Sequence, residues 1–196
     1  MSRAGDRIHF IIRAAGAAVA LAALVAGSHA ASAQAEGTAP PGIDRPADAL
    51  DFLVGEWEGT GWALGPNGRR GEFAVSESIR SRAGGHGVTF EGRGTAAIGP
   101  NGETRTVHDA FALIWAEPDG GYGMRTVVMQ GHTLEVVPEI SENRIVWGFE
   151  AGPMGETRYT STVTDGVWHE VGERRMPGET DWTVFLEMTL ERTAAP

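Results

Sequence analysis

The short stretch from Gly55 to Gly61 constrains the fold more than any other part of the chain. It reads Gly-Glu-Trp-Glu-Gly-Thr-Gly, so a tryptophan and three glycines occupy alternate positions. Successive side chains of a β-strand point to opposite faces, so these four residues would share one face. They are Gly55, Trp57, Gly59 and Gly61. Glycine weakens a strand unless the strand bends sharply or another segment approaches closely. The stretch therefore predicts the strongly coiled first strand of a small barrel.

The first 35 residues have the composition of a secretory signal peptide. Three arginines precede an apolar run over residues 14–27, and two small-residue cleavage patterns follow, ending at Ala33 and at Ala35. The apolar run is short for a membrane span. We therefore expect a periplasmic or secreted protein, cleaved near Ala33 or Ala35, with no stable membrane anchor after cleavage. The alternative is an uncleaved N-terminal anchor.

Charge and composition exclude several classes of function. Removing residues 1–35 takes away three arginines and one aspartate, which moves the net charge from −10 to −12. A chain this acidic is not expected to bind nucleic acid or an anionic membrane surface. The chain has no cysteine, so disulfides cannot stabilise it. Core burial and sheet pairing must therefore hold together the roughly 160 remaining residues, enough for one domain.

Turn residues divide the rest of the chain into short strands. We expect a flexible leader at residues 36–43, one domain at 44–192 and a frayed C-terminus at 193–196. Asp44 can cap a short helix that begins at Pro46 and runs over Ala47 to Leu53. The strands expected after it begin with Gly55 to Trp62 and continue at 71–81, 88–98, 104–116, 122–130, 132–140, 144–151, 156–164, 167–174 and 180–192.

The regular spacing of these strands predicts an all-β fold. About ten strands follow one another, each followed by Gly, Pro, Asn or Asp, as in an antiparallel meander. Asp165-Gly166 in particular is a two-residue hairpin signal. Closing such a sheet removes its edges, so we expect an up-and-down antiparallel β-barrel with the short helix at one end. The alternative is a two-sheet sandwich, which needs longer crossover connections than the sequence contains.

The opening motif resembles the signature of the calycin superfamily, which comprises lipocalins, fatty-acid-binding proteins and nitrobindins. The string from Leu50 to Gly59 and the C-terminal pattern from Gly178 to Arg192 are similar to a bacterial family of exported, lipocalin-like proteins whose domain has no known function. The resemblance covers about residues 47–192. It implies an arginine, here Arg192, lying across Trp57 as a cation–π contact worth roughly 0.5–2 kcal/mol. Gly55, Trp57, Gly59, Gly61 and Arg192 form this structural signature.

Aromatic residues and one carboxylate are candidates for a binding wall inside the barrel. Their alternation places several of them on common strand faces, and ten strands leave more interior space than eight. The candidates are Phe111, Trp115, Tyr122, Met124, Trp147, Phe149, Tyr159, Glu170 and Trp182. Strand 167–174 has two possible orientations. One turns Trp168, Glu170 and Gly172 inward, and the other turns His169, Val171 and Glu173 inward.

The sequence contains few signals for a cofactor, a metal or catalysis. Nitrobindins hold haem through a late axial histidine, and the strand after His169 has no histidine. His108 and the adjacent Asp109 point to opposite faces, so they cannot share a metal ion. There is no cysteine and no nucleophile-elbow motif. We therefore predict no cofactor, no metal and no catalytic residues.

The sequence thus predicts an exported, lipocalin-like barrel that binds a small apolar molecule. Three alternatives remain. The first is an enzyme using an interior carboxylate and a histidine on a small hydrophobic substrate. The second is a haem-binding, nitrobindin-like protein. The third is a barrel with a filled core that acts through its surface.

Overall fold

The computed structural model describes residues 46–99, 101–118 and 120–194. The predicted signal peptide, the leader and the Asp44 cap lie outside these residues. The described chain begins with α1 (Pro46–Leu50), which ends earlier than the predicted residue 53 because residues 51–53 form a turn. The strands are β1 (Gly55–Leu64), β2 (Arg70–Arg82), β3 (Gly87–Ile98), β4 (Glu103–Ala116), β5 (Tyr122–Val128), β6 (Thr133–Val136), β7 (Glu139–Ser141), β8 (Arg144–Glu150), β9 (Glu156–Thr164), β10 (Val167–Arg175) and β11 (Thr183–Ala194), with a 3₁₀ turn η1 (Gly152–Met154) before β9.

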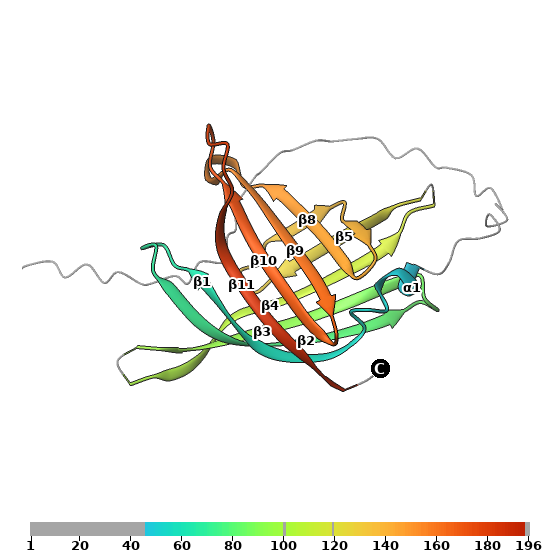
Figure 1. Cartoon of the computed structure of the whole chain (residues 1–196), viewed down its shortest axis with the longest axis horizontal. Helices are drawn as coiled ribbons and strands as arrows, with labels where there is room; N and C mark the ends of the chain where they lie inside the picture. The colour runs from blue at the N-terminus through green and yellow to red at the C-terminus, as the bar shows by residue number, and fades with distance from the viewer. Residues whose placement is uncertain (1–45, 100, 119, 195–196) are drawn as a thin grey trace, which may run out of the picture.

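Within the described residues, eleven strands form one antiparallel sheet that curls into a half-barrel (Figure 1). The order is β6-β5-β4-β3-β2-β1-β11-β10-β9-β8-β7, so strands that follow one another in sequence are paired, except β6 and β7, and β1 also pairs with β11. This confirms the predicted all-β meander, and the two-sheet sandwich is wrong. Asp165 and Gly166 join β9 to β10 with φ of 52° and 77°, which confirms the predicted hairpin.

The predicted strand 132–140 is wrong as one continuous strand. It is split into β6, which pairs with β5, and β7, which pairs with β8. The split falls at Val137 and Pro138, where Val137 is 79% exposed and Pro138 is buried. Proline has no N–H to donate to a ladder and restricts the residue before it, so pairing stops here. The sheet therefore has eleven strands rather than ten, and its two ends are adjacent in sequence.

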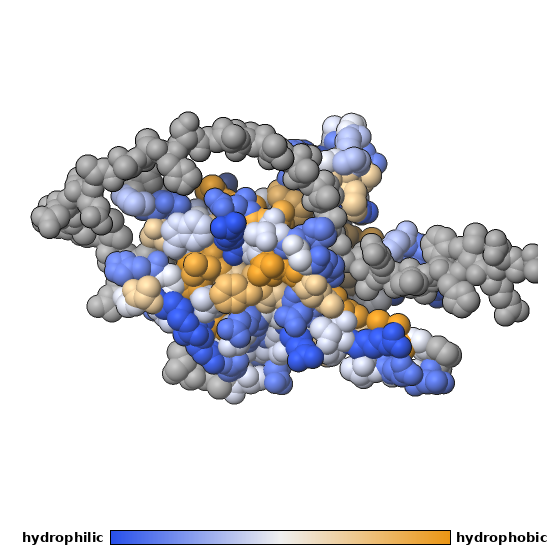
Figure 2. Space-filling model, turned by 180° about the vertical axis from the view of Figure 1, so that it is seen from behind, coloured by the Kyte–Doolittle hydropathy of each residue, from blue (hydrophilic) through white to orange (hydrophobic). Residues whose placement is uncertain are grey.

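The hydrophobic core lies on the concave face of the sheet, which we define by Trp57, Val75, Ile79 and Leu190. We call the opposite side the convex face. Leu50 and Leu53 are buried in the same core, so α1 and the turn after it cover one end of the half-barrel (Figure 1). A helix this short is not stable alone, and this packing supplies its stability. Seen from behind, apolar side chains form a band across the middle of the molecule, between hydrophilic ones (Figure 2).

Close strand packing explains two glycines of the opening motif. A Cβ at Gly59 would lie 2.6 Å from the Cα of Leu190 and would also overlap the carbonyl oxygen of Thr189. A Cβ at Gly61 would lie 2.6 Å from the Cβ of Met188. Both positions require glycine because the paired strand β11 lies too close to β1 there to leave room for a side chain. β11 itself continues to Ala194, two residues beyond the predicted end of the domain.

Candidate functional site

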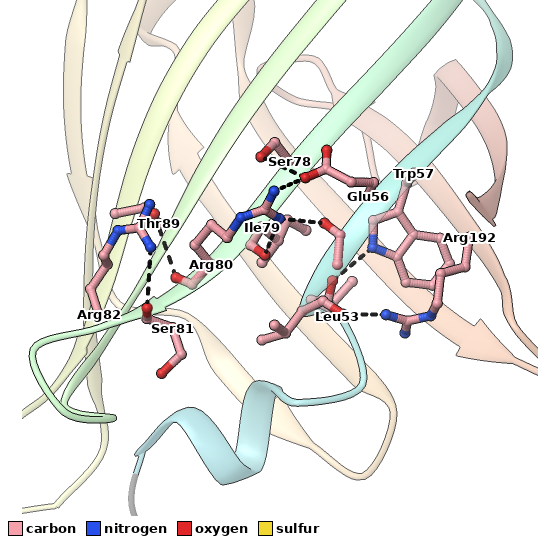
Figure 3. A network of polar contacts seen from close by, with 12 residues as sticks. Leu53, Glu56, Trp57, Ser78, Ile79, Arg80, Ser81, Arg82, Thr89 and Arg192 are labelled. Atoms are coloured by element: carbon pink, nitrogen blue, oxygen red, sulfur yellow. Dashed lines mark hydrogen bonds and ion pairs between the residues drawn. The ribbon is translucent and has the colours of Figure 1, made fainter. Parts of the chain in front are cut away.

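The floor of the concave face is built on Trp57, which is fully buried. Its indole Nε1 donates a hydrogen bond to the carbonyl of Leu53 at 2.7 Å. The guanidinium of Arg192 lies 4.1 Å from the centre of the ring, which confirms the predicted cation–π contact (Figure 3). Arg192 also donates to the carbonyls of Phe52, at 2.7 Å, and Val54. This one side chain thus joins the last strand to the segment between α1 and β1.

Strand pairing settles the orientation of β10. Trp168 pairs with Val163 and Leu190, which are both buried in the core, so it faces the concave side. Glu170 and Gly172 share that face by alternation. Trp168 packs edge-on against Trp57 with ring centres 5.7 Å apart. It is 3% exposed, and its Nε1 donor has no hydrogen-bond partner among the described residues.

Aromatic side chains line one wall of the concave face. Trp147 stacks on Tyr159 with ring centres 4.4 Å apart, and Phe149 lies 6.4 Å from Trp147. These three residues were predicted for the wall, and cross-strand pairing of Trp147 with Tyr159 brings them together. Phe185 adds an edge-on contact to Tyr159 at 5.8 Å. Gly172 leaves room for both rings, since a Cβ there would lie 3.2 Å from each.

Two carboxylates, Glu77 and Glu170, also face the concave side. Glu77 pairs with Trp57 on one side and with Gly92 on the other. A Cβ at Gly92 would lie 2.7 Å from the Oε2 atom of Glu77, so the carboxyl group rests where a side chain would otherwise be. Glu170 accepts a hydrogen bond from the hydroxyl of Ser161. Glu170 was predicted for this wall, whereas Glu77 was missed.

Burial controls the ionisation of this polar cluster. Loss of solvent raises the pKa of Glu77 from 4.5 to about 8, with a further contribution from the charge of Glu170. Burial also raises the pKa of Glu170, opposed by the Ser161 hydrogen bond and by His169. The pKa of Tyr159 is raised by burial and then by Glu170. These three residues still retain some solvent-accessible surface. They share the concave face with the aromatic wall, and this is where we place the candidate site.

The predicted inward placement of Phe111 and Trp115 is wrong. The buried side chains of β4 are Ala112 and Ile114, so the odd-numbered positions face the convex side. Phe111 is 42% exposed, and Trp115 instead donates from Nε1 to Glu117 at 2.9 Å. Alternation identifies residues that share a face, but only the partner strand decides which face is buried.

Pairing with β5 shows which side chains of β4 point to the concave face, because Ile114 pairs with Met124. Met124 is buried, and Tyr122 on the same face packs against the core. Both were predicted for the wall, and their positions agree with that prediction.

The predicted inward placement of Trp182 is also wrong. Register shifts between Gly172 and Glu173, so that Leu186 and Val184 pair with consecutive residues of β10 and Phe185 is extra. Such a bulge reverses the alternation of the residues before it. Trp182 therefore lies on the convex face, with the guanidinium groups of Arg158 and Arg175 at 4.3 and 4.8 Å from its ring. The strand begins at Thr183 rather than at the predicted residue 180.

No carboxylate–histidine pair forms on the concave face of the described chain. His169 lies on the convex face, with its Nε2 atom 2.9 Å from Glu187. Arg158 likewise pairs with Glu173 at 2.7 Å on that face, and not with Glu170. Among the described residues, no group of three or more His, Asp or Glu side chains is arranged to hold a metal ion.

Two open hollows of about 380 and 400 Å³ lie on the convex side of the sheet. Polar and charged side chains dominate the first, among them Glu91, Arg93 and Asp109, and Glu77 and Gly92 also contribute to its lining. The second lies beside Trp62 and Glu187, whose pKa is lowered chiefly by its hydrogen bond with His169. Neither hollow offers the aromatic wall that the concave face provides.

Comparisons with known proteins support the fold alone. No model of a known protein family matches the chain, and no curated protein matches it. Among solved structures, the crystal structure of Rv2717c from M. tuberculosis superimposes with a TM-score of 0.57 at 13% sequence identity. The match covers 78% of this chain and all of the other. The described residues contain no helix that is long and apolar enough to span a membrane.

Proposed function

We propose that this protein is an exported, calycin-like binding protein that holds a small, mostly apolar ligand against its concave face. The observation that carries the proposal is the stacked wall of Trp147, Tyr159 and Phe149 beside partly accessible carboxylates. Ligand pockets are typically concave, mostly aromatic or aliphatic, and contain a few placed polar groups. The signal-like N-terminus supports a role outside the cytoplasm.

The proposal includes a closed form of the half-barrel. β6 and β7 would act as one strand bent at Pro138, joining the two ends of the sheet into a ten-strand barrel. Contacts between β6 and β8 support this, because they bring the two ends of the sheet together. Closure would shield an apolar ligand from water on all sides.

Native mass spectrometry of the protein purified from its own host tests the proposal. We expect a retained small molecule, and we expect the double variant Trp147→Ala, Tyr159→Ala to lose it. The matched control is Trp115→Ala, which removes an indole from the convex face and should keep the ligand. A wild-type protein that is consistently empty, in several growth conditions, would count against the proposal.

A further inference from the structure

Resting on the proposed function, we infer that the ligand has a cationic end, an ammonium group, which lies between Glu77 and Glu170 while its apolar body packs on the aromatic wall. The two carboxylates come from β2 and β10, on opposite sides of the β1–β11 pair. Glu77 is the cross-strand partner of Trp57, and Trp57 packs at 5.7 Å between ring centres against Trp168, which lies two residues from Glu170 on the same face. An ammonium group with hydrogen-bond donors on several sides could bond to both carboxylates at once.

No side chain of the part of the chain that the structure describes supplies a cation for these carboxylates. Within the described chain, neither Glu77 nor Glu170 forms an ion pair with an arginine or histidine side chain. Arg192, the arginine at the floor, already donates to two backbone carbonyls and covers Trp57. Buried carboxylates are costly unless paired, so two of them on one concave face need a reason beyond folding.

An unused hydrogen-bond donor lies on the same face of β10 as Glu170. The indole Nε1 of Trp168 is buried and has no partner among the described residues. Trp168 lies two residues from Glu170 on the same face and packs against Trp57, the cross-strand partner of Glu77. Buried donors without partners are rare in proteins. An acceptor atom on a ligand bound against this face would satisfy the donor.

The aromatic wall suits a cation at one end and an apolar body at the other. Aromatic rings attract cations through their quadrupoles, and Tyr159 lies on the same face as Glu170, opposite Gly172 in the adjacent strand. Trp147 and Phe149 extend the same stack away from the carboxylates and would contact an apolar body. The site thus combines charge at one end with apolar surface at the other, as an amine with a hydrocarbon or aromatic body requires.

Cation binding would be coupled to proton release. Without a ligand, burial keeps the carboxyl of Glu77 protonated at neutral pH, because its pKa is about 8. An ammonium group nearby favours the carboxylate, so the Glu77 proton would leave to solvent as the ion pair forms. Part of the binding energy is used for this ionisation, and the uptake of the released proton by buffer is measurable.

Calorimetric titration with two probes of matched shape tests the inference. The probes are 4-phenylbutylamine and the neutral 4-phenylbutan-1-ol, at pH 7.5 in two buffers of different ionisation enthalpy. We expect the amine to bind at least about 10-fold more tightly, equivalent to about 1.4 kcal/mol, with proton release seen only for the amine. Glu77→Gln and Glu170→Gln should each reduce this preference. The control Glu91→Gln removes a convex carboxylate next to Gly92 and should keep it.

The outcomes separate this inference from the proposed function. Equal affinity for alcohol and amine in the wild-type protein would refute the inference that the ligand is cationic, and it would leave the proposed binding function intact. A host-derived ligand without a basic nitrogen would do the same. If neither probe binds and the host protein is empty, both proposals fail. If either glutamine variant does not fold, the wild-type protein is tested with the amine and with the anion 4-phenylbutyrate. A site for a cation must bind the amine and reject the anion, so equal binding of the two would refute the inference.

Discussion

Glu77 shows how cross-strand neighbours determine where a single side chain can lie. It stands at an apolar position of β2, two residues from Val75 and two from Ile79, which are both buried. That break in the alternation was the sequence signal that could have identified it. Glycine at position 92 then provides the space for the carboxyl group. Glu77 and Glu170 are far apart in sequence, so their proximity could not be predicted from either strand alone.

At the same scale, Trp57→Ala should strongly destabilise the fold. The substitution removes a fully buried indole, its hydrogen bond to Leu53 and the surface that Arg192 covers. We expect a loss of about 3–5 kcal/mol in the free energy of unfolding, measured by urea titration. Trp115→Ala, on the convex face, should cost at most about 1.5 kcal/mol. An unfolding curve that Trp57→Ala leaves unchanged would refute the structural role of this residue.

At the scale of elements, the pairing of β1 with β11 joins the first and last strands of the meander. It also determines which positions of β1 must be glycine. The glycines of β1 face Leu190 and Met188 at distances that leave no room for a side chain. The bulge in β11 changes which of its aromatic side chains reaches the wall. It places Trp182 on the convex face and Phe185 against Tyr159. Local irregularities of one strand therefore set the composition of the aromatic wall.

Gly59→Ala tests this close approach. The added methyl group would overlap the backbone of β11 at Thr189 and Leu190, which cannot be relieved by a rotamer change. We expect a loss of about 2–3 kcal/mol in thermal or chemical unfolding. Gly71→Ala is the control on the neighbouring strand, since its nearest atom would be 4.0 Å away. It should be neutral or stabilise by up to about 1 kcal/mol. Equal effects of the two substitutions would contradict the packing argument.

At the scale of the whole molecule, the concave carboxylates make stability depend on pH. The folded state holds the Glu77 proton up to about pH 8, whereas an unfolded chain releases it near the ordinary value of 4.5. The unfolded state therefore gains the advantage of ionisation as pH rises between these values. Below pH 4.5 both states are protonated and this penalty disappears.

We expect the free energy of unfolding to fall from pH 5 to pH 8, by up to about 1.4 kcal/mol per pH unit. Glu77→Gln should flatten this slope, and the convex variant Glu91→Gln should not. Melting temperatures measured at half-unit pH steps provide the comparison. The same slope in wild type and Glu77→Gln would show that Glu77 is not the titrating group.

A second prediction for the whole molecule concerns export. The full-length chain expressed in a bacterium with a periplasm should be found there, with a mass that fits cleavage after Ala33 or Ala35. The physical reason is the short apolar run between basic and small residues, which suits a signal peptide better than a membrane span. Intact-mass measurement of the periplasmic fraction checks it. Uncleaved protein in the membrane fraction would favour the N-terminal anchor instead.

The sequence by itself determined the meander and most of its turns, and the contact of Arg192 with Trp57 was implied by the resemblance to calycins. These features depend on local alternation, on turn residues and on the two ends of the chain meeting in one pair. Tertiary structure alone decided the break at Pro138, the convex positions of Phe111, Trp115 and Trp182, and the placement of Glu77 and Glu170 on one face. The physical reason is that alternation leaves two choices of face for each strand. Register, bulges and cross-strand partners make that choice, and they depend on segments far away in sequence.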